Sequence, residues 1–339
     1  MAVRVLVTGA GGFIGSHLVS SLKRRGYWVR GADLENPQCA ATEADEFDLL
    51  DLRRPEDAAR AVRDVEEVYA LAADMGGVGF ISQHGPRLFR NNLLINMHTL
   101  EAARASSVRR YLFASSACVY PLYRQRETSV APLREEDAYP AEPDGGYGWE
   151  KLVTEQLCQA HASDSVLEVR IARLHNVFGP LGAWTGGREK APAAICRKVA
   201  MAKLTNNPEV EIWGDGEQTR SFCYIDDCTE GLHRMMRSDC SEPLNLGQNE
   251  LISVNDLADL VASIAGVHIA KRHIDGPQGV RGRNSDNSRL REVLGWEPHI
   301  ALEEGLTRTY TWIEEQVRSA CSDLRRQMSS LAAPSTPNY

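Results

Sequence analysis

The hydrophobic pattern of the first half of the chain alternates between short strands and longer helices. Residues 3–8 form a β-branched apolar run that breaks into glycines, and helical periodicity follows from residue 13. Comparable apolar runs recur downstream, at 28–32, 65–71, 110–114 and 168–172. Strands that alternate with helices in this order predict an α/β protein with a Rossmann-type, doubly wound parallel sheet, whose ligands bind along the carboxyl ends of the strands.

Three glycines follow the first strand at a spacing typical of dinucleotide-binding turns. Gly9 can turn with positive φ, Gly12 lets the backbone approach a pyrophosphate, and Gly15 allows the helix to pack closely on the strand. Phe13 and Ile14 begin that helix, whose free N–H groups and partial positive charge favour phosphates. The strand before the turn and the amphipathic helix after it distinguish this stretch from an ordinary glycine-rich loop.

Asp33 ends the second strand, roughly 20 residues beyond the glycines. A carboxylate there accepts hydrogen bonds from the adenosine ribose hydroxyls and repels a 2′-phosphate, so it favours NAD over NADP. Arg30 lies close by in the sequence and leaves the choice between NAD and NADP open. The simpler interpretation of Asp33 itself is a solvated aspartate at a strand end. Asp51 and Leu52 follow an apolar turn and are expected on the same rim, in the cofactor site.

The pattern changes after residue 176. A glycine-rich loop precedes a helix predicted at 191–202, and residues 244–312 read as short helices and loops. We therefore expect an NAD-binding Rossmann domain at 1–176, to which 215–238 return, and a smaller substrate-binding lobe made of 177–214 and 239–318. The last residues, 319–339, are rich in Arg, Ser and Pro and predict a flexible tail.

Composition and charge exclude several classes of protein. The 339 residues are 43% hydrophobic and 25% charged, as in an ordinary globular protein, and no apolar stretch reaches transmembrane length. The net charge of −8 argues against a nucleic-acid surface. Because the first strand starts at Val3, there is no room for a signal peptide, and we expect a cytoplasmic protein whose eight cysteines are reduced. Their spacing matches no common zinc pattern, so no metal is expected.

Tyr147 and Lys151 are four residues apart at the head of a predicted helix, so both side chains can point into one pocket. A nearby ammonium and an oxidised nicotinamide both favour tyrosinate, and we expect them to lower the pKa of Tyr147 enough for it to act as a general base. By itself such a pair is more often an ordinary helix surface. Its place downstream of a dinucleotide-binding turn favours the catalytic interpretation.

Ser116, Cys118 and the Val119-Tyr120 pair come directly after the strand at 110–114. With the glycine turn and the Tyr147–Lys151 pair, they resemble the extended short-chain dehydrogenase/reductase family, in particular its nucleotide-sugar epimerases and dehydratases, over residues 3 to about 315. The 4,6-dehydratases of that family carry an acid where this chain has Cys118, which argues against a dehydratase. Further stretches resemble the GDP-mannose 3,5-epimerases within the family, at 74–79, 175–176, 186–192, 214–222 and 279–286.

The resemblance implies roles for individual residues. Cys118 and Lys190 would be the epimerising pair, and Tyr147 and Lys151 would serve the redox step. The residues implied to hold the GDP-sugar are Gly76, Ser116, Asn176, Glu189, Lys190, Ala191, Lys198, Gln218, Arg220, Ser221 and Arg283. The resemblance further implies a homodimer built on two helices of the NAD-binding domain.

The implied reaction converts GDP-D-mannose to GDP-L-galactose, with GDP-L-gulose as the 5-epimer. A sugar C–H bond is too weakly acidic to be deprotonated directly, but a transient ketone at C4 acidifies the C–H bonds at C3 and C5. Inversion then needs a base on one face and an acid on the other, and a thiolate with an ammonium, as in Cys118 and Lys190, provides both.

Simpler interpretations remain open for these residues. Cys118 alone would be a buried small hydrophobe, Lys190 a solvated loop lysine, and the two arginines partners in surface ion pairs. An alternative function with the same fold is another nucleotide-sugar epimerase or a mutase, and an alternative from another class is a redox-silent dinucleotide-binding regulator. Deuterium uptake from D₂O at C3 and C5 would separate the first alternative from a 3,5-epimerase.

Overall fold

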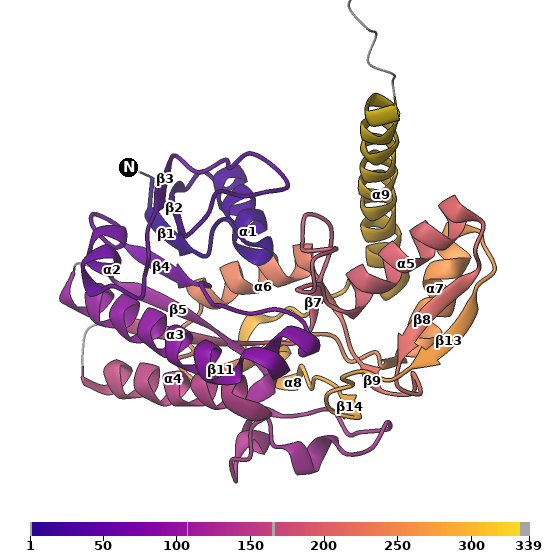
Figure 1. Ribbon diagram of the computed structural model, residues 1–339. Coiled ribbons are helices and arrows are strands. Elements are labelled where there is room, and N and C mark those ends of the chain that lie inside the picture. The colour runs from indigo at the N-terminus through magenta and orange to yellow at the C-terminus, as the bar shows by residue number, and fades with distance from the viewer. Residues whose placement is uncertain (1, 107, 165–166, 333–339) are drawn as a thin grey trace, which may run out of the picture.

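Seven parallel strands form the central layer of the molecule (Figure 1). The computed structural model describes residues 2–106, 108–164 and 167–332. The order of the strands across the sheet is β11-β6-β5-β4-β1-β2-β3. The bounds are β1 Arg4–Thr8, β2 Trp28–Asp33, β3 Glu46–Leu49, β4 Glu67–Ala70, β5 Arg110–Ser116, β6 Glu168–Leu174 and β11 Pro243–Leu246. The order reverses between β1 and β4, which is where doubly wound sheets bind ligands.

Helices cover both faces of this sheet. α1 (Phe13–Arg24) and α6 (Ile225–Arg237) pack together on one face, and α2 (Pro55–Ala61), α3 (Val78–Ala105) and α4 (Gly145–Asp164) lie on the other. Successive residues of β1 serve the two sides: Val5 and Val7 share a buried cluster with Leu18 of α1, and Leu6 shares a second one with Leu100 of α3. The predicted α/β doubly wound fold is thus confirmed.

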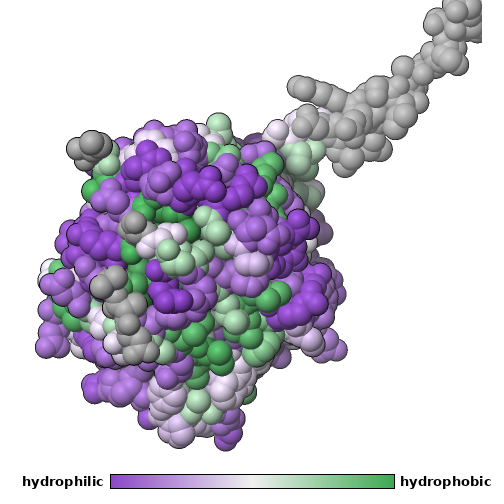
Figure 2. Space-filling model, turned by 90° about the vertical axis from the view of Figure 1, so that its left-hand side faces the viewer, coloured by the Kyte–Doolittle hydropathy of each residue, from purple (hydrophilic) through white to green (hydrophobic). Residues whose placement is uncertain are grey.

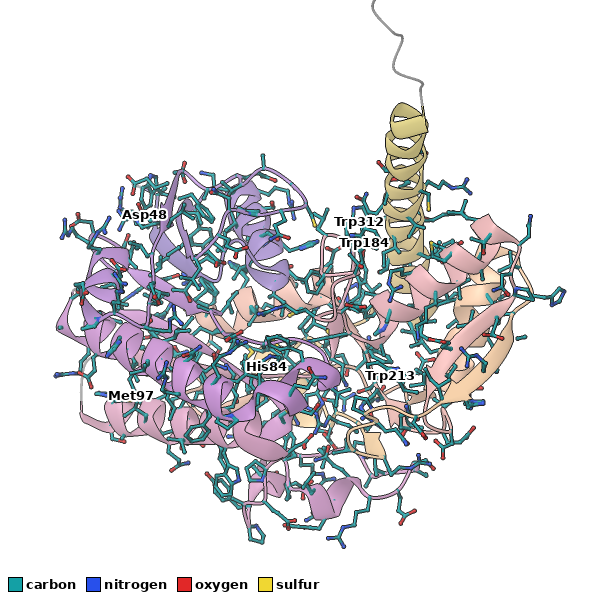
Figure 3. All side chains as sticks on the ribbon, viewed as in Figure 1. Asp48, His84, Met97, Trp184, Trp213 and Trp312 are labelled. Carbon is teal, nitrogen blue, oxygen red and sulfur yellow. The ribbon has the colours of Figure 1, made fainter. Side chains whose placement is uncertain are left out.

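A smaller lobe is built on the parallel pair β8 (Glu209–Trp213) and β13 (Ala270–Ile274), with α5 (Ala191–Thr205) and α7 (Val254–Ala265) beside it. α9 (Leu302–Ala332) packs on α5 and α7, and Trp312 of α9 packs against the same buried cluster as Trp184 (both labelled in Figure 3). The remaining elements are η1 Ala117–Val119, η2 Leu122–Gln125, η3 Glu135–Ala138, β7 Val177–Phe178, β9 Thr219–Arg220, β10 Cys223–Tyr224, β12 Ile252–Ser253, β14 Gly282–Arg283 and α8 Ser288–Leu294.

Three elements differ from the sequence predictions. β3 replaces the expected turn before Asp51, because its polar residues Glu46 and Asp48 face Arg30 and hide the strand pattern. β11 is an edge strand of the main sheet, although its residues were expected in the smaller lobe; it is short and begins with proline, which edge positions tolerate. α9 continues as a helix to residue 332 where a tail was expected from 319 onward, and residues 333–339 lie outside the described part.

A three-stranded sheet, β12-β9-β14, joins distant parts of the smaller lobe. Because β9 pairs with both neighbours, the stretches around Arg220 and Arg283 lie side by side. Thr219 Oγ1 donates to the carbonyl oxygen of Thr128 at 2.5 Å, which fixes this sheet against the segment that follows β5. Among the helices described, none combines the length and the apolar character needed to cross a bilayer.

Candidate active site

The glycine turn after β1 is closed by its own backbone. Gly9 has φ +69° and its N–H donates to the carbonyl oxygen of Ala32 at 2.8 Å. A Cβ at Gly15 would collide with the carbonyl oxygen of Gly9, so only glycine lets α1 approach the strand this closely. Both features are those that the sequence predicted for Gly9 and Gly15.

The N-terminus of α1 opens onto this turn. Gly12 is the capping residue and supplies no side chain to the helix end, and Phe13 and Ile14 are the first helical residues. Backbone N–H groups at the start of a helix bind anions well when no side chain already satisfies them. A pyrophosphate therefore fits the cradle formed by the turn and the helix end.

The two predicted cofactor carboxylates have different partners. Asp33 accepts hydrogen bonds from the N–H groups of Gly11 at 2.8 Å and Leu34 at 2.6 Å, and its burial raises its pKa. Asp51 is held by Arg53, whose guanidinium donates to both carboxylate oxygens at 2.7 Å and lowers the pKa of Asp51. The arginine was not anticipated, and Leu52 beside this pair is buried.

Tyr147 and Lys151 project from the first turns of α4 toward the carboxyl end of β5. Lys151 Nζ donates to the carbonyl oxygen of Ala114 at 3.0 Å and lies 5.6 Å from the centroid of the Tyr147 ring. The Tyr147 hydroxyl is 3.9 Å from Met75 Sδ. Burial, chiefly, raises the pKa of Tyr147 well above its usual value. The lowering expected from the sequence is therefore not produced by the chain alone, because burial, with the nearby Glu150 and Cys118, outweighs the hydrogen bond from Ser116 that lowers the pKa.

Cys118 lies in the turn directly after β5. Its N–H donates to Ser116 Oγ at 3.2 Å, and its Sγ is 3.3 Å from Arg283 Nη1, which donates to it. Arg283 is only 6% exposed and is fixed by Gln125, whose Oε1 accepts from Nε at 2.6 Å. The buried guanidinium of Arg283 therefore places a positive charge beside the Cys118 thiol.

Lys190 immediately precedes α5, at the end of a glycine-rich loop. Burial lowers its pKa, while the nearby Cys118 and Cys228 act in the opposite direction. The same Cys118 adds to the raised pKa of Tyr147. Cys118, Lys190 and Tyr147 come from three separate segments of the chain. The structure brings them close enough for the charge of Cys118 to influence the pKa of both Lys190 and Tyr147.

Several predicted substrate residues lie around the group formed by Cys118, Lys190 and Tyr147. Asn176 has φ +37° and its Nδ2 donates to the carbonyl oxygen of Ser221 at 2.9 Å. Burial, aided by the neighbouring Arg283, lowers the pKa of Arg220 to about 9. Two buried side-chain atoms of this group, Gln218 Oε1 and Ser221 Oγ, have no hydrogen-bond partner within the described residues, and Arg283 Nη2 has only an ion pair with Asp144 at 3.6 Å. Buried polar atoms left in this way are expected to bind a ligand or water.

The other predicted residues are held by the chain itself. Lys198 Nζ donates to the carbonyl oxygen of Glu211 at 2.7 Å. Glu189 pairs with Arg197 at 3.1 Å, and Ala191 is the first residue of α5. Gly76 lies against the side chain of Phe80. A role for Lys198 or Glu189 in binding a substrate would therefore require exchange of these contacts.

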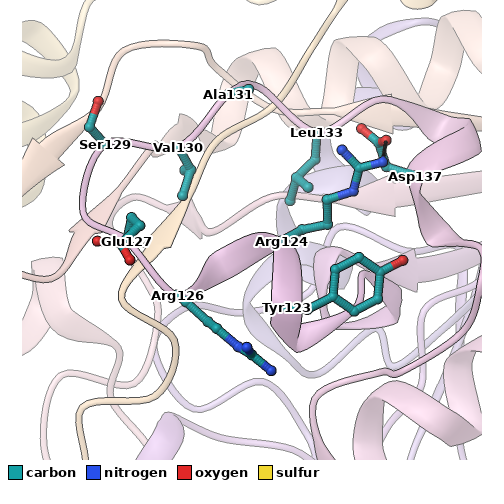
Figure 4. A pocket seen from close by; sticks show the side chains of 9 residues that line it. All are labelled: Tyr123, Arg124, Arg126, Glu127, Ser129, Val130, Ala131, Leu133 and Asp137. Atoms are coloured by element: carbon teal, nitrogen blue, oxygen red, sulfur yellow. Dashed lines mark ion pairs between the residues drawn. The ribbon is translucent and has the colours of Figure 1, made fainter.

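Sequence reasoning did not identify Gln125 and Met75, which contact Arg283 and Tyr147. No pattern in the sequence around either residue marks it as part of the site. Gln125, for example, is 158 positions away from Arg283, which it contacts. A separate pocket of about 350 Å³ lies in the segment between η2 and η3, and none of the predicted site residues lines it (Figure 4). An ion pair of 2.9 Å between Arg124 and Asp137 lies on its wall.

Comparison with known proteins gives concordant results. Residues 5–247 match the model of the NAD dependent epimerase/dehydratase family. GDP-mannose 3,5-epimerase of Arabidopsis thaliana is 47% identical over 317 residues, which cover 93% of this chain and 83% of that protein. GDP-mannose 3,5-epimerase 1 of Oryza sativa subsp. indica is also 47% identical and is covered to 82%.

Solved structures resemble this fold over nearly their whole length. UDP-glucose 4-epimerase of Thermotoga maritima, determined with UDP-glucose, has a TM-score of 0.83 at 27% identity and aligns over 93% of this chain and 99% of that one. UDP-glucose 4-epimerase of Thermus thermophilus, in complex with NAD, has a TM-score of 0.79 at 26% identity, covering 91% of this chain and 98% of that one.

Proposed function

Since the chain belongs to the NAD-dependent epimerase/dehydratase family, with NAD as its cofactor, we propose that it epimerises GDP-D-mannose at C3 and C5. The products are GDP-L-galactose and, after inversion at C5 alone, GDP-L-gulose. The relatives with 47% identity support this substrate. The main support for the proposal is that Cys118, Lys190 and Tyr147 lie close to one another at the carboxyl edge of the sheet.

The glycine turn and the N-terminus of α1 hold the pyrophosphate of NAD, and Asp33 binds the adenosine ribose. NAD supplies a reversible hydride acceptor for C4 of the sugar. Tyr147 takes the proton of the C4 hydroxyl, and Ser116 hydrogen-bonds the oxygen that becomes the ketone. Burial raises the pKa of Tyr147, so the tyrosinate form would require Lys151 together with the positive charge that a bound, oxidised nicotinamide would supply.

Cys118 and Lys190 carry out the inversion once C4 is a ketone. One of them removes the proton from C3 or C5 on one face, and the other delivers a proton to the opposite face. Arg283 Nη1 donates to Cys118 Sγ at 3.3 Å and places a positive charge beside the reacting sulfur. Burial lowers the pKa of Lys190, which brings this amine closer to proton exchange at neutral pH.

The nucleotide diphosphate is held by the smaller lobe. Arg220 and Arg283 lie on the neighbouring strands β9 and β14, and guanidinium groups bind phosphate oxygens in a fixed, forked geometry. The unpartnered oxygens of Gln218 and Ser221 provide polar contacts to the same ligand.

The test is incubation of the purified protein with GDP-mannose in D₂O, followed by NMR of the sugar. Deuterium should enter at C3 and C5, and new epimers should accumulate without net formation of NADH. Inversion at C4 with no deuterium in the ring would instead identify a 4-epimerase. A sugar that takes up no deuterium and forms no epimer would exclude epimerisation of this substrate.

We further propose a homodimer that forms through α3 and α4. Met97 of α3 and Trp149 and Val153 of α4 are large hydrophobic residues that are 45%, 43% and 45% exposed. Figure 2 shows hydrophobic residues gathered in the lower half of one face, at the level where α3 and α4 lie in Figure 1, and Figure 3 labels Met97 there. Exposed apolar groups of this kind mark association surfaces. A cytoplasmic location agrees with the eight free cysteines.

A further inference from the structure

Arg188 joins the loop that carries Lys190 to the loop that follows β4. Its Nη1 donates to the carbonyl oxygen of Met75 at 2.9 Å, and Nη1 and Nη2 both lie 3.4 Å from Asp74 Oδ1. Its guanidinium also covers the ring of Phe80, 4.0 Å from the ring centroid. A side chain that is 49% exposed thus makes contacts with backbone, carboxylate and aromatic groups of the other lobe.

The main chain strengthens the same junction. The N–H of Gly77 donates to the carbonyl oxygen of Arg188 at 3.1 Å. A Cβ at Gly77 would lie 2.5 Å from the carbonyl oxygen of Glu189, so a larger residue would force the two loops apart. His84, labelled in Figure 3, stacks on the Phe80 ring with the centroids 4.5 Å apart.

The loop before Lys190 is held mainly by polar contacts: the N–H of Gly187 donates to Glu189 Oε2 at 2.7 Å, and the carbonyl oxygen of Trp184 accepts from Arg197 Nε at 2.9 Å. Gly186 and Gly187 have φ +87° and +84°, and a Cβ at either position would meet no atom within 4 Å. Glycines in open space leave the backbone free to take other conformations. The position of Lys190 therefore depends on the contacts of its neighbours, and those of Arg188 reach across to the NAD-binding domain.

Asp74, the acceptor of this contact, is connected to the redox pair. Its N–H donates to Asn92 Oδ1 at 2.7 Å, and Asn92 Nδ2 donates to Glu150 Oε1 at 3.0 Å. Glu150 is fully buried and lies 3.8 Å from Lys151 Nζ. Arg188 is thus linked through three side chains to the lysine beside Tyr147.

We propose that Arg188 is a positioning residue that fixes the height of Lys190 above the sugar by binding Asp74 and the carbonyl group of Met75. The proposal rests on the proposed epimerase function. Met75 also contacts the Tyr147 hydroxyl, so the arginine sets the acid/base loop relative to the group that handles the C4 proton. Proton transfer at C3 and C5 depends directly on the position of Lys190, whereas oxidation at C4 depends on Tyr147 and on Lys151, which the carbonyl oxygen of Ala114 and the carboxylate of Glu150 hold in place without Arg188.

Arg188→Gln should lower the rate of deuterium uptake at C3 and C5 by roughly 10- to 100-fold, because a displacement of about 1 Å costs that much in proton transfer. Reduced nicotinamide formed in a single turnover with saturating GDP-mannose should be within about twofold of the unaltered protein. Arg188→Lys keeps the charge but not the forked geometry, and should restore part of the rate. A general loss of folding would reduce both readouts together and would lower the melting temperature.

Asp74→Asn supplies the partner variant. If Arg188 acts through Asp74, the double variant should lose no more activity than Arg188→Gln alone, whereas independent effects would multiply. Arg272→Gln is the matched control, since Arg272 is 50% exposed and its ion pairs are with Glu209 and Glu211 of β8 and not with the loop before Lys190. An Arg188→Gln protein whose ring exchange equals that of the control overturns the proposal. No exchange in the unaltered protein would instead overturn the proposed function.

Discussion

Arg283 Nη1 donates to Cys118 Sγ across 3.3 Å, and the two residues are 165 positions apart in the sequence. Arg283 lies on β14 of the smaller lobe and Cys118 in the turn after β5 of the main sheet. The contact therefore exists only when the two lobes are assembled. It places a positive charge beside the thiol that the proposed inversion requires.

Arg283→Gln should slow deuterium exchange at C3 and C5 by about 10- to 100-fold, since a hydrogen bond to a charged group contributes about 1.5–3 kcal/mol. The measurement is NMR of GDP-mannose in D₂O at a saturating substrate concentration, so that weaker binding does not contribute. Arg283→Lys should retain more activity, because it keeps a charge near Cys118. An exchange rate unchanged by the glutamine variant would contradict the role of the contact.

Two variants should separate the redox step from the inversion. Cys118→Ala should still bind NAD and form reduced nicotinamide with GDP-mannose, but should take up no deuterium at C3 or C5. Lys190→Ala should behave in the same way, and Tyr147→Phe should block both steps because the C4 proton has no acceptor. Stopped-flow absorbance of the nicotinamide and NMR of the sugar provide the two readouts. Normal epimerisation by Cys118→Ala would exclude the thiol from the reaction.

Asp33→Ser should change the preference for the cofactor. Loss of a charged acceptor should weaken NAD by about tenfold, while the loss of repulsion should strengthen NADP by a similar factor. Titration calorimetry with each dinucleotide gives both constants. Asp48→Ser is the control, because Asp48 is a 41% exposed aspartate on the neighbouring strand β3 (Figure 3). Equal effects of the two substitutions would argue against ribose recognition by Asp33.

The stability of the protein should fall on mild acidification. Burial lowers the pKa of His233 from 6.5 to about 4, so below pH 6.5 the unfolded chain binds a proton that the folded chain does not. Stability is therefore lost as the pH falls from about 6.5 toward 4, at less than about 1.4 kcal/mol per pH unit because solvent screens this half-buried ring. His233→Gln, which can still hydrogen-bond Tyr27, should flatten this slope in urea denaturation series. If the stability of the variant has the same slope against pH as that of the unaltered protein, a group other than His233 causes the loss of stability.

Trp149→Glu should convert the proposed dimer to a monomer, because a carboxylate would be buried in the apolar contact between α4 helices. Light scattering coupled to gel filtration measures the mass directly. Val293→Glu is the control, since Val293 is 37% exposed on α8, away from α3 and α4. If both variants have the mass of the unaltered protein, the dimer does not form through this surface.

The sequence alone was sufficient for features that depend on neighbouring residues. The turn at Gly9–Gly15 is local, and both its positive φ and its close helix contact follow from the spacing of its glycines. Tyr147 and Lys151 share a helix face because they are four residues apart. Edge elements were less predictable: β3 carries polar residues, and β11 is only four residues long and begins with proline, so neither shows a strand pattern.

Only the tertiary structure decided the environment of the reactive groups. The sequence could name Cys118 and Lys190, but their proximity depends on how the smaller lobe folds against the sheet. The pairing of Asp51 with Arg53, the raised pKa of Tyr147 and the contacts of Arg188 were not predicted. Burial sets the pKa of Tyr147 and contacts between distant segments set the environment of Arg188, and neither is encoded in the spacing of residues along the chain; Asp51 and Arg53 are two positions apart, but their pairing depends on the conformation of the turn.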